Sequence, residues 1–238
     1  MAARSKDPLT AATTSVLKPA LAEHGFRRHT GRCFVRYQRP VAQFLDIQLS
    51  SWGSKDFAIN YFILPLFPQR AFIGSNFAGR FPRGKSGDGW WPAKDHARAD
   101  SSMEEIVEKF HSFAIPIYDA SATIDGLIRS LKPMTVSGNS HILRDYAFSM
   151  IYAGDTSKGL GEMDGARNAF QKALGEMSSR DWCAAAVREC DRLAEACAAG
   201  EQAALFEQWI ERSEGTLKLQ EKAKANKTLH PTAGNAPV

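Results

Sequence analysis

Apolar and polar residues alternate along two neighbouring segments of this chain. Apolar side chains recur at every second position in Leu45–Leu49 and again in Phe57–Ile63. A period of two is typical of strands that bury one face of a sheet and leave the other in solvent. The polar residues between the two segments, around Gly53, predict a turn. We therefore expect an antiparallel hairpin.

The register of this hairpin gathers polar side chains on its outer face. It places Asp46 opposite Asn60 and Gln48 opposite Ala58, while the aliphatic side chains form the core against helices. Carboxylate and amide groups side by side are suited to a polar ligand or peptide. The alternative is a solvated face with cross-strand hydrogen bonds, which is common in antiparallel sheets.

Further elements are predicted around the hairpin. Asp7 as N-cap and Pro8 as the first helical residue begin a helix that ends at Gly25. Cys33–Tyr37 completes an antiparallel meander, and a fourth strand is predicted near Ala71–Phe77.

A long surface loop is expected over residues 78–100, because glycines, prolines and mixed charge occur there without periodicity. Helix is predicted to resume at Ser102, which has capping-box spacing to Glu105, and to kink or break at Pro116. A further helix is predicted over Ile124–Leu131.

Beyond Pro133 the strand-forming pattern stops. Asn139 is predicted to cap a helix, and helices are expected over residues 163–174, 181–199 and 201–223. The chain is thus predicted to be α+β: a meander sheet packed on helices in residues 1–136, then a small all-α helical-hairpin bundle in 137–223. Residues 224–238 have the composition of a disordered tail.

The composition limits the classes of function. The 238 residues carry a net charge of +4, which by itself demands no nucleic-acid partner. No run approaches the ~20 apolar residues of a membrane helix, so we expect a cytoplasmic protein without membrane contact. Four cysteines without a Cys-x-x-Cys pair argue against a metal site and a disulfide framework. We expect no cofactor.

A basic, aromatic hairpin is predicted between Phe26 and Pro40. It contains no acidic residue, and Phe34 and Tyr37 are interleaved with its basic side chains: Arg27, Arg28, His29, Arg32, Arg36 and Arg39. Such a surface can track a phosphate backbone and stack bases, and it can also steer an acidic protein. Arginines on edge strands also simply discourage aggregation. Arg36 is a candidate binding residue in either binding role.

Two neighbouring tryptophans, Trp90 and Trp91, follow Gly89 in the long loop. Both cannot be fully buried, so we expect one to plug the core and the other to be available for contact. Both are retained as candidate binding residues.

The segment Gly79–Ser86 matches the Walker A pattern, with Lys85 for phosphate and Ser86 for magnesium. A P-loop needs a strand before it and a helix directly after it. Gly87, Gly89 and Pro92 prevent a helix there. We treat nucleotide binding as the least favoured hypothesis.

Residues ~8–132 resemble the bacterial domain of unknown function family 4304 (DUF4304). The order of helix, meander, Trp-Trp loop and helix carries the resemblance, together with short motifs: Leu17-Lys18-Pro19, His24-Gly25-Phe26, Asp46-Ile47-Gln48, Ser51-Trp52-Gly53, Phe57-Ala58-Ile59-Asn60 and Gly89-Trp90-Trp91. The resemblance implies no known activity.

Two resemblances concern the rest of the chain. The predicted helical pair around residues 139–174 resembles a degenerate tetratricopeptide hairpin, in Tyr152, Gly154, Ala166, Phe170 and Ala173. The closing Thr228–Ala233 is similar to tails of mobile gene-cassette products, which makes a defence or immunity role attractive.

The sequence offers no acid–base pair, nucleophile constellation or metal set, so no catalytic residue is proposed. We expect a non-catalytic protein that binds another protein. The candidate binding residues are Arg36, Asp46, Gln48, Asn60, Trp90 and Trp91. Nucleic-acid binding through Arg27–Arg39 is the alternative.

Overall fold

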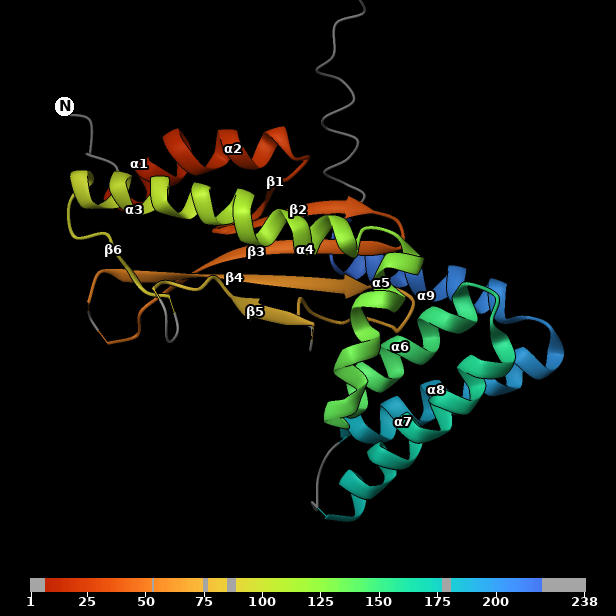
Figure 1. Cartoon of the computed structure of the whole chain (residues 1–238). Helices are drawn as coiled ribbons and strands as arrows, with labels where there is room; N and C mark the ends of the chain where they lie inside the picture. The colour runs from red at the N-terminus through yellow and green to blue at the C-terminus, as the bar shows by residue number, and fades with distance from the viewer. Residues whose placement is uncertain (1–6, 53, 75–76, 85–88, 177–180, 220–238) are drawn as a thin grey trace, which may run out of the picture.

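The computed structural model describes residues 7–52, 54–74, 77–84, 89–176 and 181–219, and their fold is α+β (Figure 1). An antiparallel sheet has the strand order β1-β2-β3-β4-β5, and β6 also pairs with β4. The strands are β1 (Arg27–Thr30), β2 (Cys33–Gln38), β3 (Val41–Leu49), β4 (Asp56–Pro65), β5 (Ala78–Arg80) and β6 (Trp91–Pro92).

The predicted meander and its register are confirmed. Asp46 pairs with Asn60, and Gln48 pairs with Ala58. The prediction of a strand near Ala71–Phe77 is wrong. The next strand, β5, begins directly after that range, at Ala78. The connection between β4 and β5 is bonded to a distant helix instead. The backbone N–H of Arg70 donates to the hydroxyl of Ser213 on that helix (2.9 Å).

Helices cover one face of the sheet along its whole length, as Figure 1 shows. Asp7 caps the first of them by accepting from the N–H of Thr10 (3.2 Å), and Gly25 ends it in the left-handed region at φ 78°, both as predicted. These helical segments are α1 (Pro8–Ala12), the π-helical turn η1 (Thr13–Leu17), α2 (Lys18–Glu23), α3 (His96–Lys109), the π-helical turn η2 (Phe110–Ala114) and α4 (Ile115–Ala120).

The start of α3 differs from the prediction. The helix begins at His96 because Asp95 provides the cap, accepting from the N–H of Arg98 (2.9 Å). Ser102 lies inside the helix, where its hydroxyl donates to the carbonyl of Pro92 and holds β6 in place (2.8 Å). The expected kink at Pro116 is a change of hydrogen-bond pattern, since the π turn η2 leads directly into α4.

The remaining helices gather at one end of the sheet (Figure 1). Asn139 caps α6 as predicted, accepting from the N–H groups of His141 (3.0 Å) and Ile142 (3.3 Å). The helix expected at 163–174 is longer than predicted at both ends. Gly159 in its first turn lets it approach α6 closely, since a Cβ there would lie 2.4 Å from Ile151. The bounds are α5 (Ile124–Leu131), the 3-10 turn η3 (Lys132–Ser137), α6 (Ser140–Tyr152), α7 (Thr156–Glu176), α8 (Asp181–Ala199) and α9 (Gln202–Thr216).

The predicted helix over 201–223 is observed as α9 to Thr216. Its last predicted residues and the tail 224–238 lie outside the described residues.

Helix α9 packs on the sheet face opposite to α1–α4, at the end formed by the β2–β3 turn. The hydroxyl of Tyr37 on β2 donates to the buried carboxylate of Glu214, and Arg39 pairs with both Glu207 (2.9 Å) and Glu214 (3.2 Å). The carbonyl of Leu219 accepts from Arg27 on β1 (2.7 Å). No helix of the described residues covers the far half of this sheet face.

A buried ion network joins the segment after β4 to the helical part. Arg70 pairs with Asp145 on α6 (2.7 Å), Asp145 also accepts from Arg144 (3.2 Å), and Arg144 pairs with Glu189 on α8 (3.0 Å). One cluster of buried apolar residues extends through the sheet, its helices and the C-terminal helices, from Leu9 to Leu219. The division near residue 137 therefore stays a prediction about chain organisation, with a continuous core across it.

His141 lies beside this network. Its ring stacks on Trp182 (5.0 Å between centroids) and meets the edge of Phe170 (5.0 Å). Burial, assisted by the positive charge of Arg144, lowers the pKa of His141 from 6.5 to about 4. The folded state therefore keeps the imidazole neutral.

We predict that Asp145→Ala destabilises the protein by about 3–5 kcal/mol, because it leaves two buried guanidinium groups without their shared carboxylate. Urea unfolding measures the loss. Asp191→Ala is the matched control: Asp191 pairs with Arg167 at 2.6 Å on the surface, and its loss should cost less than about 1 kcal/mol. Equal losses in the two variants would contradict a structural role for the buried network.

A second prediction concerns acid stability. Because the pKa of His141 is lower in the folded state, the unfolded chain binds more protons between pH 6.5 and 4, and stability falls as the pH drops through this window. Replacing His141 with Gln removes the titration. The drop in unfolding free energy between pH 7 and pH 4.5 should then be smaller by about 1–2 kcal/mol. An unchanged drop would show that His141 titrates equally in both states.

Candidate functional site

The uncovered half of the sheet carries a connected set of polar side chains from three strands. Gln48 on β3 accepts from the amide of Asn60 on β4 (2.9 Å). Arg80 on β5 donates to the carbonyl oxygens of both Gln48 (2.9 Å) and Asn60 (3.2 Å). These bonds hold the guanidinium in place between β3 and β4. We call Asp46, Gln48, Asn60, Arg80 and Trp90 the polar sheet surface.

The two tryptophans of the long loop point to opposite faces. Trp91 is fully buried beside Phe57 on the helix-covered face. Trp90 is half-buried on the polar sheet surface, where the guanidinium of Arg80 lies 4.9 Å from its ring centroid. Gly89 permits this path, since a Cβ there would lie 2.3 Å from the carbonyl oxygen of Phe81. The expectation that one of the two tryptophans plugs the core is confirmed for Trp91. A contact role for the half-buried Trp90 stays a prediction.

Asp46 brings the one carboxylate of the polar sheet surface. It is half-buried next to Cys33 in the β2–β3 pairing. Desolvation raises the pKa of this carboxyl, and the nearby positive charge of Arg32 partly offsets the effect. Asp46 therefore presents a partner with an acceptor that is already partly desolvated.

The β3–β4 hairpin ends in an exposed tryptophan. Trp52 is 91% exposed, and Leu49 at the end of β3 is 42% exposed. The hydroxyl of Ser50 accepts from the N–H of Trp52 (3.2 Å) and contacts the hydroxyl of Ser54 (3.1 Å), which holds the turn. Sequence reasoning did not select Trp52 as a binding residue, although an aromatic residue in a polar turn is a usable signal.

Arg36 lies away from the polar sheet surface. Its side chain is on the helix-covered face, where it donates to Gln43 (2.6 Å) and pairs with Asp119 (2.8 Å). Its guanidinium lies over the rings of Phe26 (5.4 Å) and Tyr118 (5.7 Å). In this position it stabilises the contact between β2 and α4.

The basic hairpin is divided by its internal partners. Arg27 and Arg39 are bound to the α9 region, and Arg36 is bound to α4. Arg28 and Arg32 remain exposed, with Arg28 donating to the carbonyl of Gly31 (2.8 Å). The basic face available to a partner is therefore smaller than the sequence suggests.

The Walker-A-like segment begins in an antiparallel edge strand. Gly79 belongs to β5, and a Cβ there would lie 2.6 Å from the hydroxyl of Tyr61, which gives this glycine a packing role. The next helix in the part of the chain that the structure describes begins at His96. Lys85 and Ser86 lie outside the described residues.

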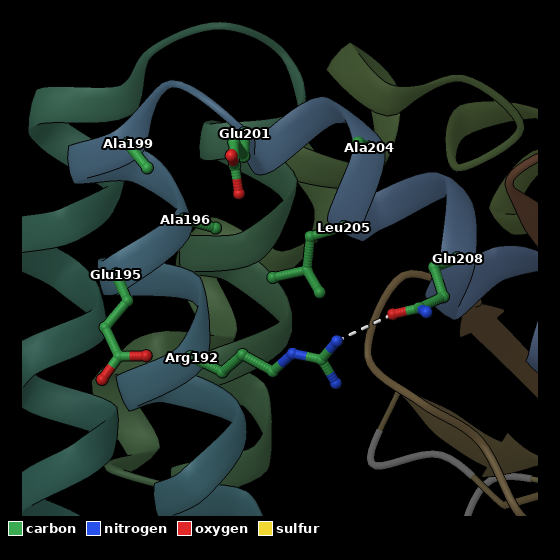
Figure 2. Close-up of a pocket in the computed structure, with 8 residues that line it drawn as sticks. All are labelled: Arg192, Glu195, Ala196, Ala199, Glu201, Ala204, Leu205 and Gln208. Carbon is green, nitrogen blue, oxygen red and sulfur yellow. Dashed lines mark hydrogen bonds between the residues drawn. The ribbon is translucent and has the colours of Figure 1, made fainter.

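A groove of about 630 Å³ separates α8 from α9, and Figure 2 shows its lining. Arg192 reaches across it and donates to Gln208 (2.8 Å), and the rest of the lining includes Ala196, Ala199 and Leu205. None of these side chains offers a buried polar group to a ligand. We do not assign a site to this groove.

The described ranges contain neither a metal-binding cluster nor a membrane-spanning helix. No three His, Cys, Asp or Glu side chains within them lie close enough together to hold a metal ion. None of the helices there has both the length and the apolar character to span a bilayer.

Residues 17–120 match the family model described as "Domain of unknown function (DUF4304)", which confirms the resemblance for this part of the chain. The matched range contains every strand and the whole polar sheet surface. No curated protein and no solved structure matches the chain.

Proposed function

We propose that this chain, with its DUF4304 region over residues 17–120, binds another protein through the polar sheet surface and the neighbouring β3–β4 turn. The observation that carries the proposal is the guanidinium of Arg80, held by Gln48 and Asn60 and stacked on Trp90. Arg and Trp are the residue types most enriched among side chains that dominate binding energy.

Preorganisation favours this surface. Ordering a long side chain on binding costs about 0.5–1.5 kcal/mol, and the two hydrogen bonds of Arg80 remove much of that cost beforehand. Trp52 adds a large apolar group that is 91% exposed in the same hairpin as Gln48. A binding surface spread over three strands and a turn suits a macromolecule better than a small ligand, which needs a concave site.

The chemistry of the surface supports binding without catalysis. It offers one carboxylate, two amides, one guanidinium and one indole ring, which can donate, accept and stack. Activation of a nucleophile needs a base within hydrogen-bond reach of a hydroxyl or thiol. The polar sheet surface has no hydroxyl or thiol among its members.

Nucleic-acid binding through the basic hairpin is the second candidate. Its support is reduced by the internal pairs of Arg27, Arg36 and Arg39. Strong phosphate binding would show as an affinity that falls steeply with salt. The affinity of a protein partner for the polar sheet surface should depend less on the salt concentration.

The test begins with affinity capture by the full chain, followed by identification of the captured protein and measurement of its dissociation constant. Trp52→Ala and Arg80→Ala should each weaken binding by about tenfold or more, because each removes an anchor of the surface. Arg129→Ala on the exposed side of α5 is the matched control and should leave the dissociation constant unchanged.

Two outcomes oppose the proposal. A partner that binds both variants as tightly as the unaltered chain uses a different surface. Recovery of nucleic acid alone, released by moderate salt and weakened in an Arg28→Ala, Arg32→Ala double variant, would favour the basic hairpin instead.

A further inference from the structure

A second concave region lies between the connection after β4 and the helical part. It has a volume of about 590 Å³, within the range of small-molecule sites. Gln69–Phe72 and Gly74 form one side, and residues of α6 and α8 form the other. The side chains that matter for the argument are Arg70, Phe72, His141, Arg144, Trp182 and Glu189. We call this region the arginine cavity.

Among the described residues, two side chains of the ion network that lines the arginine cavity keep an atom without a hydrogen-bond partner. All three guanidinium nitrogens of Arg144 are engaged, with Asp145 and Glu189. Arg70 uses Nε on the carbonyl of Pro65 (3.0 Å) and Nη2 on Asp145 (2.7 Å). Within the described part of the chain, Nη1 of Arg70 and Oε1 of Glu189 have no hydrogen-bond partner.

These two groups belong to side chains held in place before any ligand arrives. Arg70 is 9% exposed and lines the cavity. The bond from Arg144 to Oε2 of Glu189 (3.0 Å) fixes the carboxylate. A ligand with an acceptor and a donor on one edge would give a hydrogen-bond partner to Nη1 of Arg70 and to Oε1 of Glu189.

The charges of the cavity balance. Two guanidinium groups, Arg70 and Arg144, are offset by two carboxylates, Asp145 and Glu189. His141 contributes no charge at neutral pH, since its pKa is lowered to about 4. A free phosphate would meet no excess positive charge, so the site favours an uncharged polar group.

Aromatic side chains form the apolar lining. Trp182 is 45% exposed at the cavity and rests on the ring of His141. Phe72, 73% exposed, lines the cavity from the connection after β4. Exposed aromatic rings beside a fixed polar edge suit a flat ring that can stack.

We propose that the arginine cavity binds a planar heteroaromatic molecule of the guanine type, stacked on Trp182, with its carbonyl oxygen on Arg70 and its ring N–H on Glu189. Guanine presents an acceptor and a donor side by side, and arginine pairs readily with its carbonyl oxygen. This site is separate from the polar sheet surface, and the inference does not depend on the proposed function.

Titration calorimetry of the full chain with guanosine tests the proposal, with inosine, adenosine and cytidine as comparison probes. Guanosine and inosine should bind, because both carry the carbonyl oxygen beside a ring N–H. Adenosine and cytidine should bind at least about tenfold more weakly. The absence of phosphate in all four probes separates base recognition from anion binding.

Two variants and a matched control locate the site. Glu189→Gln and Trp182→Ala should each weaken guanosine binding by about tenfold. Glu195→Gln, on the exposed side of the same helix, should leave it unchanged. Circular dichroism of each variant checks that the helices remain folded.

The proposal is overturned if none of the four nucleosides binds with a dissociation constant of about 1 mM or tighter. It is also overturned if guanosine binds with the same affinity to both variants. Tight binding of inorganic phosphate with no binding of guanosine would replace it with an anion site.

Discussion

The structure depends on a buried guanidinium. Arg70 leaves the end of the sheet and enters the helical part, where it must find a counter-charge because an isolated buried charge is very costly. Asp145 supplies that charge and is itself held by Arg144. This pairing fixes the connection after β4 against α6, and with it the position of the helical part on the sheet.

The same arrangement explains why one sheet face is only half covered. Ser213 on α9 accepts from the backbone of Arg70 and donates to the carbonyl of Leu66, so α9 is tied to the end of the sheet where β4 finishes. Its buried Glu214 meets Tyr37 and Arg39 at that end. No helix of the described ranges covers the opposite end, and the polar sheet surface lies there. The arginine cavity is the space that remains beside the same network.

Local signals in the sequence predicted the local structure. The alternation of Leu45–Leu49 and Phe57–Ile63 was sufficient for the register, because a slip by one residue would bury Asp46 and Gln48. Asp7 and Asn139 were identified as caps by residue type and position. The DUF4304 resemblance is likewise confirmed over residues 17–120.

Contacts between distant segments were not predictable in this way. Arg80 joins Gln48 and Asn60 only because the chain returns as β5 after the long connection, and no local pattern marks it. Arg36 was selected for its charge, yet its partner Asp119 lies on α4, far along the chain. Arg70 and Asp145 are 75 residues apart in sequence. Long-range pairs of this kind are specified by packing, which a single sequence does not display.

Differential scanning calorimetry of the full chain tests most directly whether the sheet and the helical part form one cooperative unit. The account predicts one transition with equal calorimetric and van't Hoff enthalpies, because the core and the Arg70 network cross between the two parts. Two separable transitions, with the sheet surviving after the C-terminal helices have melted, would contradict it.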